Sequence, residues 1–192
     1  GVRHCGDGRP QAGAAMTLVV DASVIIKWLL QDSGRESATE HATELMRAVV
    51  LGEVGVLQPF HWLAEVAAVA CRLSPATAER DVLRIQALEL PATDAPAVLA
   101  RACRIATRSR THAFDALYHA VALETPAAVL VTADDAYFRA ARSLGGIVSL
   151  ADWRNAAVAG SHESTPMTWR CPNGWRASSP SLQSIPRSSS RA

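Results

Sequence analysis

The sequence has few of the features that mark a metal-thiolate, secreted or membrane protein. Its four cysteines stand far apart with no Cys-x-x-Cys pair, which argues against a zinc knuckle, a redox dithiol or a disulfide framework and favours a reducing compartment. The longest apolar runs reach about ten residues and each contains an acid, which is too short to span a membrane. Residues 1–15 contain no apolar stretch typical of a signal peptide. We therefore expect a cytoplasmic protein.

Aromatic residues and lysine are also scarce. Aromatics make up 5% of the 192 residues, which argues against an extended base-stacking platform, and Lys27 is the single lysine. A hydrophobic content of 49% and a net charge of +1 exclude a disordered chain and a global basic field. That charge is unevenly spread, since residues 16–154 carry 13 basic and 16 acidic side chains, a net −3. The sequence thus predicts an acidic domain with basic flanks.

Composition divides the chain into three parts. Residues 1–15 lack periodicity and are expected to be a leader outside the domain. Residues 155–192 hold nine serines and four prolines and are expected to be a disordered tail, because such a stretch buries too little apolar area to offset its ordering entropy. Residues 16–154 form the predicted folded domain.

Within this domain, short apolar strands alternate with helices, which predicts an α/β fold with a parallel sheet covered on both faces. We expect Ser74 and Pro75 to open the fourth helix as a cap and a first-turn proline. The predicted strands are 17–20, 54–57, 128–131 and 147–150, and the predicted helices are 22–30, 35–50, 60–73, 74–88, 95–108, 113–124 and 135–144.

Four acids occupy apolar surroundings. Asp21 and Asp134 each follow a buried-type strand, Glu65 is the only polar residue between Trp62 and Cys71, and Asp115 lies in the segment AFDALY. A lone carboxylate in a nonpolar environment is costly unless its pKa rises until it is neutral. Taken singly, Asp21 and Asp134 are explained as helix N-caps, Glu65 as paired with an arginine or solvated, and Asp115 as a cap or a partner of a histidine.

Convergence on one cation explains all four acids together. Residues 16–154 contain one lysine and twelve arginines, most of them outside these apolar runs. Carboxylate oxygens without Cys or His at ligand spacing favour Mg²⁺ or Mn²⁺ over zinc. The carboxyl ends of strands are also where open α/β sheets place their sites. The sequence therefore predicts a divalent-cation site.

These motifs resemble, in order and spacing, those of PIN-domain nucleases, most closely the VapC-type toxins of bacterial toxin–antitoxin pairs. The resemblance rests on the segments LVVDASV (18–24), the Glu65 helix after Pro59, FDALY (114–118) and VTAD (131–134), and it covers nearly all of residues 16–154. It implies a three-layer α/β/α sandwich with a mostly parallel sheet. It also implies an endoribonuclease that uses Mg²⁺ or Mn²⁺, forms a homodimer and is held inactive by a cognate antitoxin.

The resemblance assigns the acidic quartet to Asp21, Glu65, Asp115 and Asp134. Thr132 and Ser23 match the small hydroxyl positions beside it. We expect Asp21 and Asp115 to ligate the cation directly, and Asp134 and Glu65 to hold its waters or orient the attacking water. Thr132 would fix a carboxylate rotamer by a hydrogen bond. Asp135 directly follows the last acid and is a rival for its role.

Several other residues have two interpretations. Arg101, Arg104 and Arg108 share one helix face, so they are candidates for tracking RNA phosphates, although a solvated face explains them as well. Trp28 and Trp62 fall on aliphatic-rich helices and are expected in the core or at a dimer interface. His61, His112 and His119 are candidate RNA contacts, with structural roles the stronger expectation.

Three other functional classes are alternatives to a PIN-domain nuclease. A HAD-like phosphatase needs a second aspartate two residues after the first, where this chain has Ser23. A response-regulator receiver needs an early adjacent acidic pair and a late lysine, and both are missing. The remaining alternative is a catalytically silent PIN-like module that binds RNA or protein; failure to bind Mn²⁺ would favour it.

Overall fold

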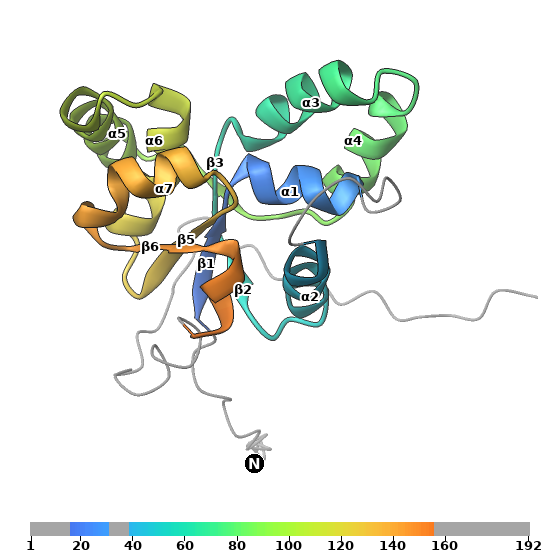
Figure 1. Cartoon of the computed structure of the whole chain (residues 1–192), viewed down its shortest axis with the longest axis horizontal. Coiled ribbons are helices and arrows are strands. Elements are labelled where there is room, and N and C mark those ends of the chain that lie inside the picture. Colours follow the sequence, from blue (N-terminus) through green and yellow to red (C-terminus); the bar gives the residue numbers. More distant parts are fainter. Residues whose placement is uncertain (1–15, 31–38, 156–192) are drawn as a thin grey trace, which may run out of the picture.

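The computed structural model describes residues 16–30 and 39–155 (Figure 1). The predicted leader 1–15, nearly all of the predicted tail 155–192 and the predicted first turn of the second helix lie outside these residues. The elements, in chain order, are β1 Thr17–Val20, α1 Ala22–Leu29, α2 Thr39–Val50, β2 Gly55–Val56, β3 Gln58–Pro59, α3 Trp62–Leu73, α4 Ala78–Gln86, β4 Ala92–Thr93, α5 Pro96–Ser109, α6 Ala113–Glu124, β5 Ala128–Thr132, α7 Asp135–Ala141 and β6 Ile147–Ser149, with short 3₁₀ turns at Arg142–Leu144 and Leu150–Asp152.

The main sheet has the strand order β2-β1-β5-β6, and every neighbouring pair is parallel. Figure 1 shows α5, α6 and α7 on one side of this sheet and α1 and α2 on the other, with α3 and α4 beside α1. The predicted three-layer α/β/α sandwich with a mostly parallel sheet is therefore confirmed.

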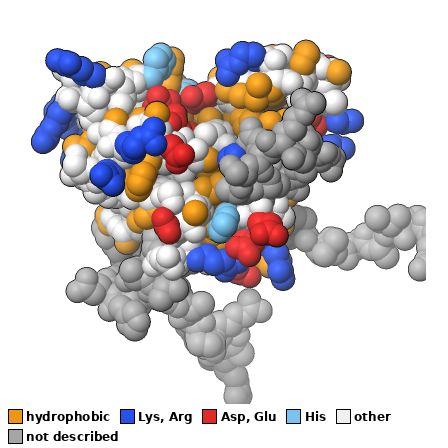
Figure 2. Space-filling view, in the orientation of Figure 1, with side chains coloured by type: hydrophobic (Ala, Val, Ile, Leu, Met, Phe, Trp, Pro, Cys, Tyr) orange, Lys and Arg blue, Asp and Glu red, His pale blue; other side chains and the backbone are white. Residues whose placement is uncertain are grey.

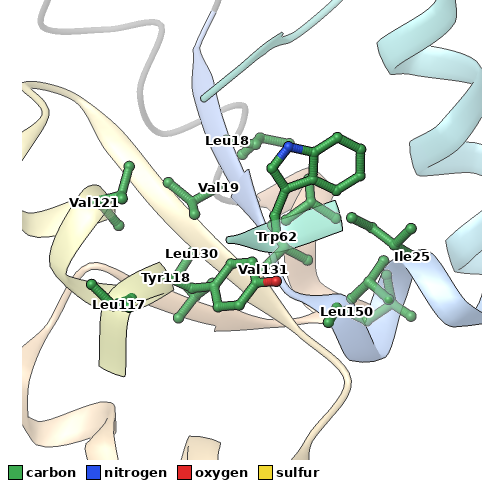
Figure 3. Packing of buried hydrophobic residues seen from close by; sticks show 14 of the residues in the cluster. Leu18, Val19, Ile25, Trp62, Leu117, Tyr118, Val121, Leu130, Val131 and Leu150 are labelled. Carbon is green, nitrogen blue, oxygen red and sulfur yellow. The ribbon is translucent and has the colours of Figure 1, made fainter. Parts of the chain in front are cut away.

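The two central strands, β1 and β5, are mostly buried on both faces, as their apolar sequences predict. Leu18, Val19 and Val20 of β1 have no exposed surface. Val19 lies opposite Leu130 of β5, and both pack against the α6 residues Leu117 and Val121 (Figure 3). Because burying one such side chain contributes roughly 1.5–3 kcal/mol, this core holds the ends of β1 and β5 in a fixed relation.

Trp28 and Trp62 are 5% and 6% exposed, so they belong to the core of the single chain, one of the two positions expected for them.

His119 is fully buried, so its predicted structural role is confirmed. Its Nε2 lies 2.7 Å from the Gly145 carbonyl oxygen and its Nδ1 lies 3.2 Å from the Tyr137 hydroxyl. Nε2–H therefore donates to the carbonyl and Nδ1 accepts from Tyr137, which ties α6 to α7 with a neutral imidazole.

The prediction that Ser74 and Pro75 begin a helix is wrong. The Ser74 N–H bonds the Ala70 carbonyl oxygen at 2.8 Å, so Ser74 ends α3 instead. The chain then turns through Pro75, and α4 begins at Ala78 after Thr77. A Ser-Pro pair that follows a helix directly fits its end as well as the start of the next one.

A second, two-stranded parallel sheet, β3 with β4, was not predicted. The Phe60 N–H bonds the Thr93 carbonyl oxygen at 3.0 Å, which keeps the chain extended past Pro59 and delays α3 to Trp62 instead of Phe60. The predicted strand 54–57 correspondingly shortens to Gly55–Val56. Strands of two residues are too short to show periodicity in a sequence.

The Gln58 side chain bonds the backbone of β1 beyond the point where its pairing with β2 ends. Its side-chain oxygen accepts a hydrogen bond from the Val20 N–H at 2.9 Å, and its amide donates to the Val20 carbonyl oxygen at 2.7 Å. Both residues are fully buried. The amide thus satisfies two backbone groups one residue before Asp21, where water has no access.

We expect Gln58→Leu to lower the free energy of unfolding by about 2–4 kcal/mol, because two buried backbone groups lose their partners. Urea unfolding measures this as a lower midpoint at unchanged slope. Gln86→Leu, at an exposed position on α4, is the matched control and should change stability by less than about 0.5 kcal/mol. Equal midpoints for the two variants would show that the Gln58 amide does not stabilise β1.

A second prediction concerns pH. Burial lowers the pKa of His119 below its ordinary value of 6.5, in spite of the hydrogen bond to Gly145. The unfolded state then binds more protons than the folded state just below pH 6.5, so this contribution to stability is present above pH 6.5 and is lost as the pH falls. The unfolding free energy of the wild type should therefore drop between pH 7.5 and pH 5 more steeply than that of His119→Gln. Parallel profiles from urea unfolding at each pH would contradict this.

Candidate metal and nucleic-acid site

The four acids singled out in the sequence line one pocket. Asp21, Glu65, Asp115 and Asp134 come from the end of β1, from α3, from α6 and from the end of β5, and they surround a pocket of about 440 Å³. Figure 2 shows acidic side chains in the hollow between the lobe of α5 and α6 and the lobe of α3 and α4. Asp135 is exposed and does not line the pocket.

The pocket lies where the sheet reverses its direction of winding. The chain leaves β1 through α1 and returns beside it at β2, whereas it leaves β5 through α7 and returns at β6 on the opposite side. The helices that follow these two adjacent strands therefore diverge to opposite faces (Figure 1). This divergence opens a crevice at their carboxyl ends, the usual position of a site in an open α/β sheet.

Asp21 has both a local and a long-range role. Its Oδ1 accepts the Ser23 N–H at 3.3 Å and caps α1, as one of its interpretations predicted. Its Oδ2 accepts a short hydrogen bond from the Thr132 hydroxyl at the end of β5. Burial raises the pKa of Asp21, while the hydrogen bonds from Thr132 and Ser23 oppose that rise. Thr132 therefore fixes the carboxylate rotamer across the two central strands.

Asp134 has a similar double role at α7. Its Oδ1 accepts the N–H groups of Ala136 and Tyr137 at 2.8 and 2.9 Å. The Asp134 N–H in turn bonds the Thr132 hydroxyl at 3.0 Å, and the neighbouring Ala133 N–H bonds the Ser23 hydroxyl at 3.1 Å. Thr132 and Ser23 thus join the two capped helix starts through one hydrogen-bond network.

Asp115 shows that the four charges act on one another. Burial is the largest cause that raises its pKa to about 6, and the nearby carboxylates of Asp21, Glu65 and Asp134 raise it further, while His112 lowers it. Mutual repulsion of this kind arises when several acids share one site without a compensating cation.

Glu65 lies against a histidine, not the arginine that one interpretation expected. His61 Nε2 is 3.3 Å from Glu65 Oε2, and the two side chains are 8% and 25% exposed. The contact is not aligned as a hydrogen bond, so Glu65 Oε2 is a buried oxygen without a hydrogen-bond partner among the residues described. Such an oxygen fits a site that takes a cation or a bound water.

The chemistry of the donor set fits a hard divalent cation, since four carboxylates face one pocket and one of their oxygens is unsatisfied. Their spacing is open: within residues 16–30 and 39–155, no three Asp, Glu, His or Cys side chains stand close enough to hold one ion. The carboxylates would therefore have to draw together around a bound cation.

Two cations at this pocket were missed in the sequence. Lys27 on α1 and Arg72 on α3 both line it, four residues after Ser23 and seven after Glu65. Residues four or seven apart lie on the same face of a helix, so the spacing of Lys27 from Ser23 and of Arg72 from Glu65 would have identified both cations. They place positive charge at the edge of an otherwise acidic pocket.

The predicted arginine track on α5 lies elsewhere. None of Arg101, Arg104 and Arg108 lines the acidic pocket. Arg101 forms an ion pair with Glu124 of α6, whereas Arg104 and Arg108 are exposed.

A further hollow of about 450 Å³ between α3 and α4 has Glu89 as the one acid among its lining residues, so it offers no comparable cation site.

Comparison with known proteins gives one family match and no individual relative. No curated protein matches the chain. In the described part of the chain, no helix is both long and apolar enough to cross a membrane. The family model of the PIN domain matches residues 18–143, more than half of the chain and a stretch that contains all four acids. PIN domains are generally metal-dependent nucleases, so the match supports a nuclease-type function. The chain belongs to the PIN domain family.

Proposed function

We propose that this protein is a Mg²⁺-dependent endoribonuclease, with Mn²⁺ as a substitute ion. The observation that carries the proposal is the pocket itself, since four carboxylates from distant parts of the chain line it at the carboxyl ends of β1 and β5. Helix capping explains Asp21 and Asp134 singly, but it does not explain why Glu65 and Asp115 line the same pocket. Hydrolysis of a phosphodiester does require a site that concentrates a divalent cation beside an activated water.

Asp21 and Asp115 would hold the cation directly, and Asp134 and Glu65 would orient water around it. A bound divalent cation would supply charge neutralisation and ease deprotonation of a water near neutral pH. Thr132 keeps the Asp21 carboxylate aimed at the pocket through its hydrogen bond. Lys27 and Arg72 would attract the RNA phosphates to the pocket edge, and the α5 arginines remain our prediction for a more distant backbone contact.

We further propose that the enzyme is the toxin of a toxin–antitoxin pair, acting as a cytoplasmic homodimer and restrained by a cognate antitoxin protein. This part rests on the resemblance of the ordered acidic motifs to VapC-type toxins. Exposed leucines on α3 and α4, Leu73 and Leu83, at 52% and 59% exposure, offer apolar surface for such partners.

The decisive substitution is Asp21→Asn, which removes a charge at nearly constant volume. We expect it to abolish both Mg²⁺-dependent RNA cleavage and growth arrest on expression, while circular dichroism and the unfolding midpoint show an intact fold. Asp135→Asn is the matched control, since Asp135 neighbours Asp134 but lies outside the pocket; it should retain full activity. Full activity of Asp21→Asn would overturn the assignment.

Cation binding can be scored without RNA. Mn²⁺ should raise the melting temperature of the wild type, because a ligand at one hundred times its Kd stabilises the folded state by about 2.7 kcal/mol. Asp115→Asn should lose most of this shift, whereas Asp135→Asn should keep it. Calorimetric titration that finds no Mn²⁺ binding to the wild type would favour the catalytically silent module that binds RNA or protein.

A further inference from the structure

Four rings lie in a row beside the acidic pocket. The His61 ring lies 5.5 Å from the Phe60 ring and 5.0 Å from the Phe114 ring, measured between centroids. Phe114 in turn stacks on His112 at 5.6 Å with 29° between the ring planes. Phe114 directly precedes Asp115, and His61 touches Glu65. We call these four residues, Phe60, His61, His112 and Phe114, the ring row.

The exposure of two of these rings has no structural explanation. Seven large hydrophobic side chains are exposed among the residues described, and two of the seven are aromatic. These two, Phe60 at 52% and Phe114 at 49%, both contact the buried His61. Exposed phenylalanine is unfavourable in water, so its concentration beside a charged pocket indicates a ligand with an apolar face.

Figure 2 shows hydrophobic and histidine side chains directly beside the acidic hollow. A ligand that spans both must carry anionic groups and a flat apolar group within one short covalent unit. A nucleotide has this composition, since its phosphate and its base are joined through one sugar. Aromatic rings bind unpaired bases by stacking without sequence preference.

We propose that Phe114, backed by His61 and His112 and flanked by Phe60, stacks on an unpaired nucleobase of single-stranded RNA beside the scissile phosphate. The inference rests on the proposed nuclease function and adds to it the side chains that hold a base next to the cut. A base inside a duplex is stacked on its neighbours and cannot reach Phe114, so this contact requires an unpaired base.

The test measures binding of an oligoribonucleotide of about ten nucleotides to the full chain in the Asp21→Asn background, so that the strand stays uncut. In a series of strands, each nucleotide in turn is made abasic. One or two positions should show a loss of affinity of about 5- to 150-fold, since one stacked base is worth about 1–3 kcal/mol. Phe114→Ala should lose the same factor on the intact strand and become insensitive to those abasic positions.

Two further variants separate stacking from apolar contact. Phe114→Leu keeps apolar area without an aromatic face and should behave like Phe114→Ala, while Phe114→Trp should restore the sensitivity to the base. Leu51→Ala, at a comparably exposed position just after α2, should leave binding unchanged. In the active background, Phe114→Ala should raise KM for single-stranded RNA by a similar factor.

The outcomes distinguish this inference from the proposed function. Wild-type protein that binds the strand with base sensitivity but never cleaves it would overturn the nuclease function and leave the ring row supported. Cleavage with affinity that is indifferent to every abasic position, or undiminished in Phe114→Ala, would overturn the ring row alone. Absence of strand binding would overturn it too. A change of oligomeric state in Phe114→Ala, with base sensitivity intact, would instead assign these rings to contact between two copies of the chain.

Discussion

β1 and β5 run side by side in parallel, with Val20 opposite Val131, and this pairing decides where the acids stand. After these strands, α1 and α7 pack on opposite faces of the sheet. Asp21 and Asp134, which begin the two helices, therefore lie at the crevice between α1 and α7. Thr132 then bridges the two ends through its hydroxyl, and Gln58 fixes the free edge of β1. α3 and α6 add Glu65 and Asp115 from above the same edge. A shift of either strand by one residue would disperse the quartet.

Electrostatics and packing oppose each other in this pocket. Burial raises the pKa of Asp21, and burial together with the neighbouring carboxylates raises that of Asp115 to about 6. Hydrogen bonds from backbone N–H groups hold Asp21 and Asp134 in place, and the Thr132 hydroxyl also bonds Asp21. Lys27 and Arg72 add positive charge to the lining of the pocket. A site of this kind stores electrostatic repulsion that a divalent cation relieves, which matches the nuclease-type function typical of PIN domains.

Much of the fold and the positions of the acids could be predicted from the sequence because each rests on a strong local contrast. Strands such as LVV and AVLV are uniformly apolar, so an acid at their ends is conspicuous. The role of Gln58 could not be found in this way. Its side chain bonds the backbone of Val20, which lies 38 residues earlier in the sequence, so no local pattern marks the contact. The β3–β4 pair is too short to produce a pattern, and Ser74 carries the same signal at a helix end as at a start. Phe60 and Phe114 resemble core residues until their exposure is known.

Asp21 and Asp134 each commit one carboxylate oxygen to the start of a helix. Asparagine caps a helix as well as aspartate does, whereas alanine costs about 0.5–2 kcal/mol at such a position. Truncation of either acid to alanine would therefore loosen α1 or α7 together with the pocket, and lost activity would not distinguish a missing ligand from a frayed helix. Capping alone thus requires a polar side chain at both positions, whether or not the pocket holds a cation. Glu65 and Asp115 lie within the first turns of α3 and α6 and cap neither helix, so a change at either position alters the pocket while α1 and α7 stay capped.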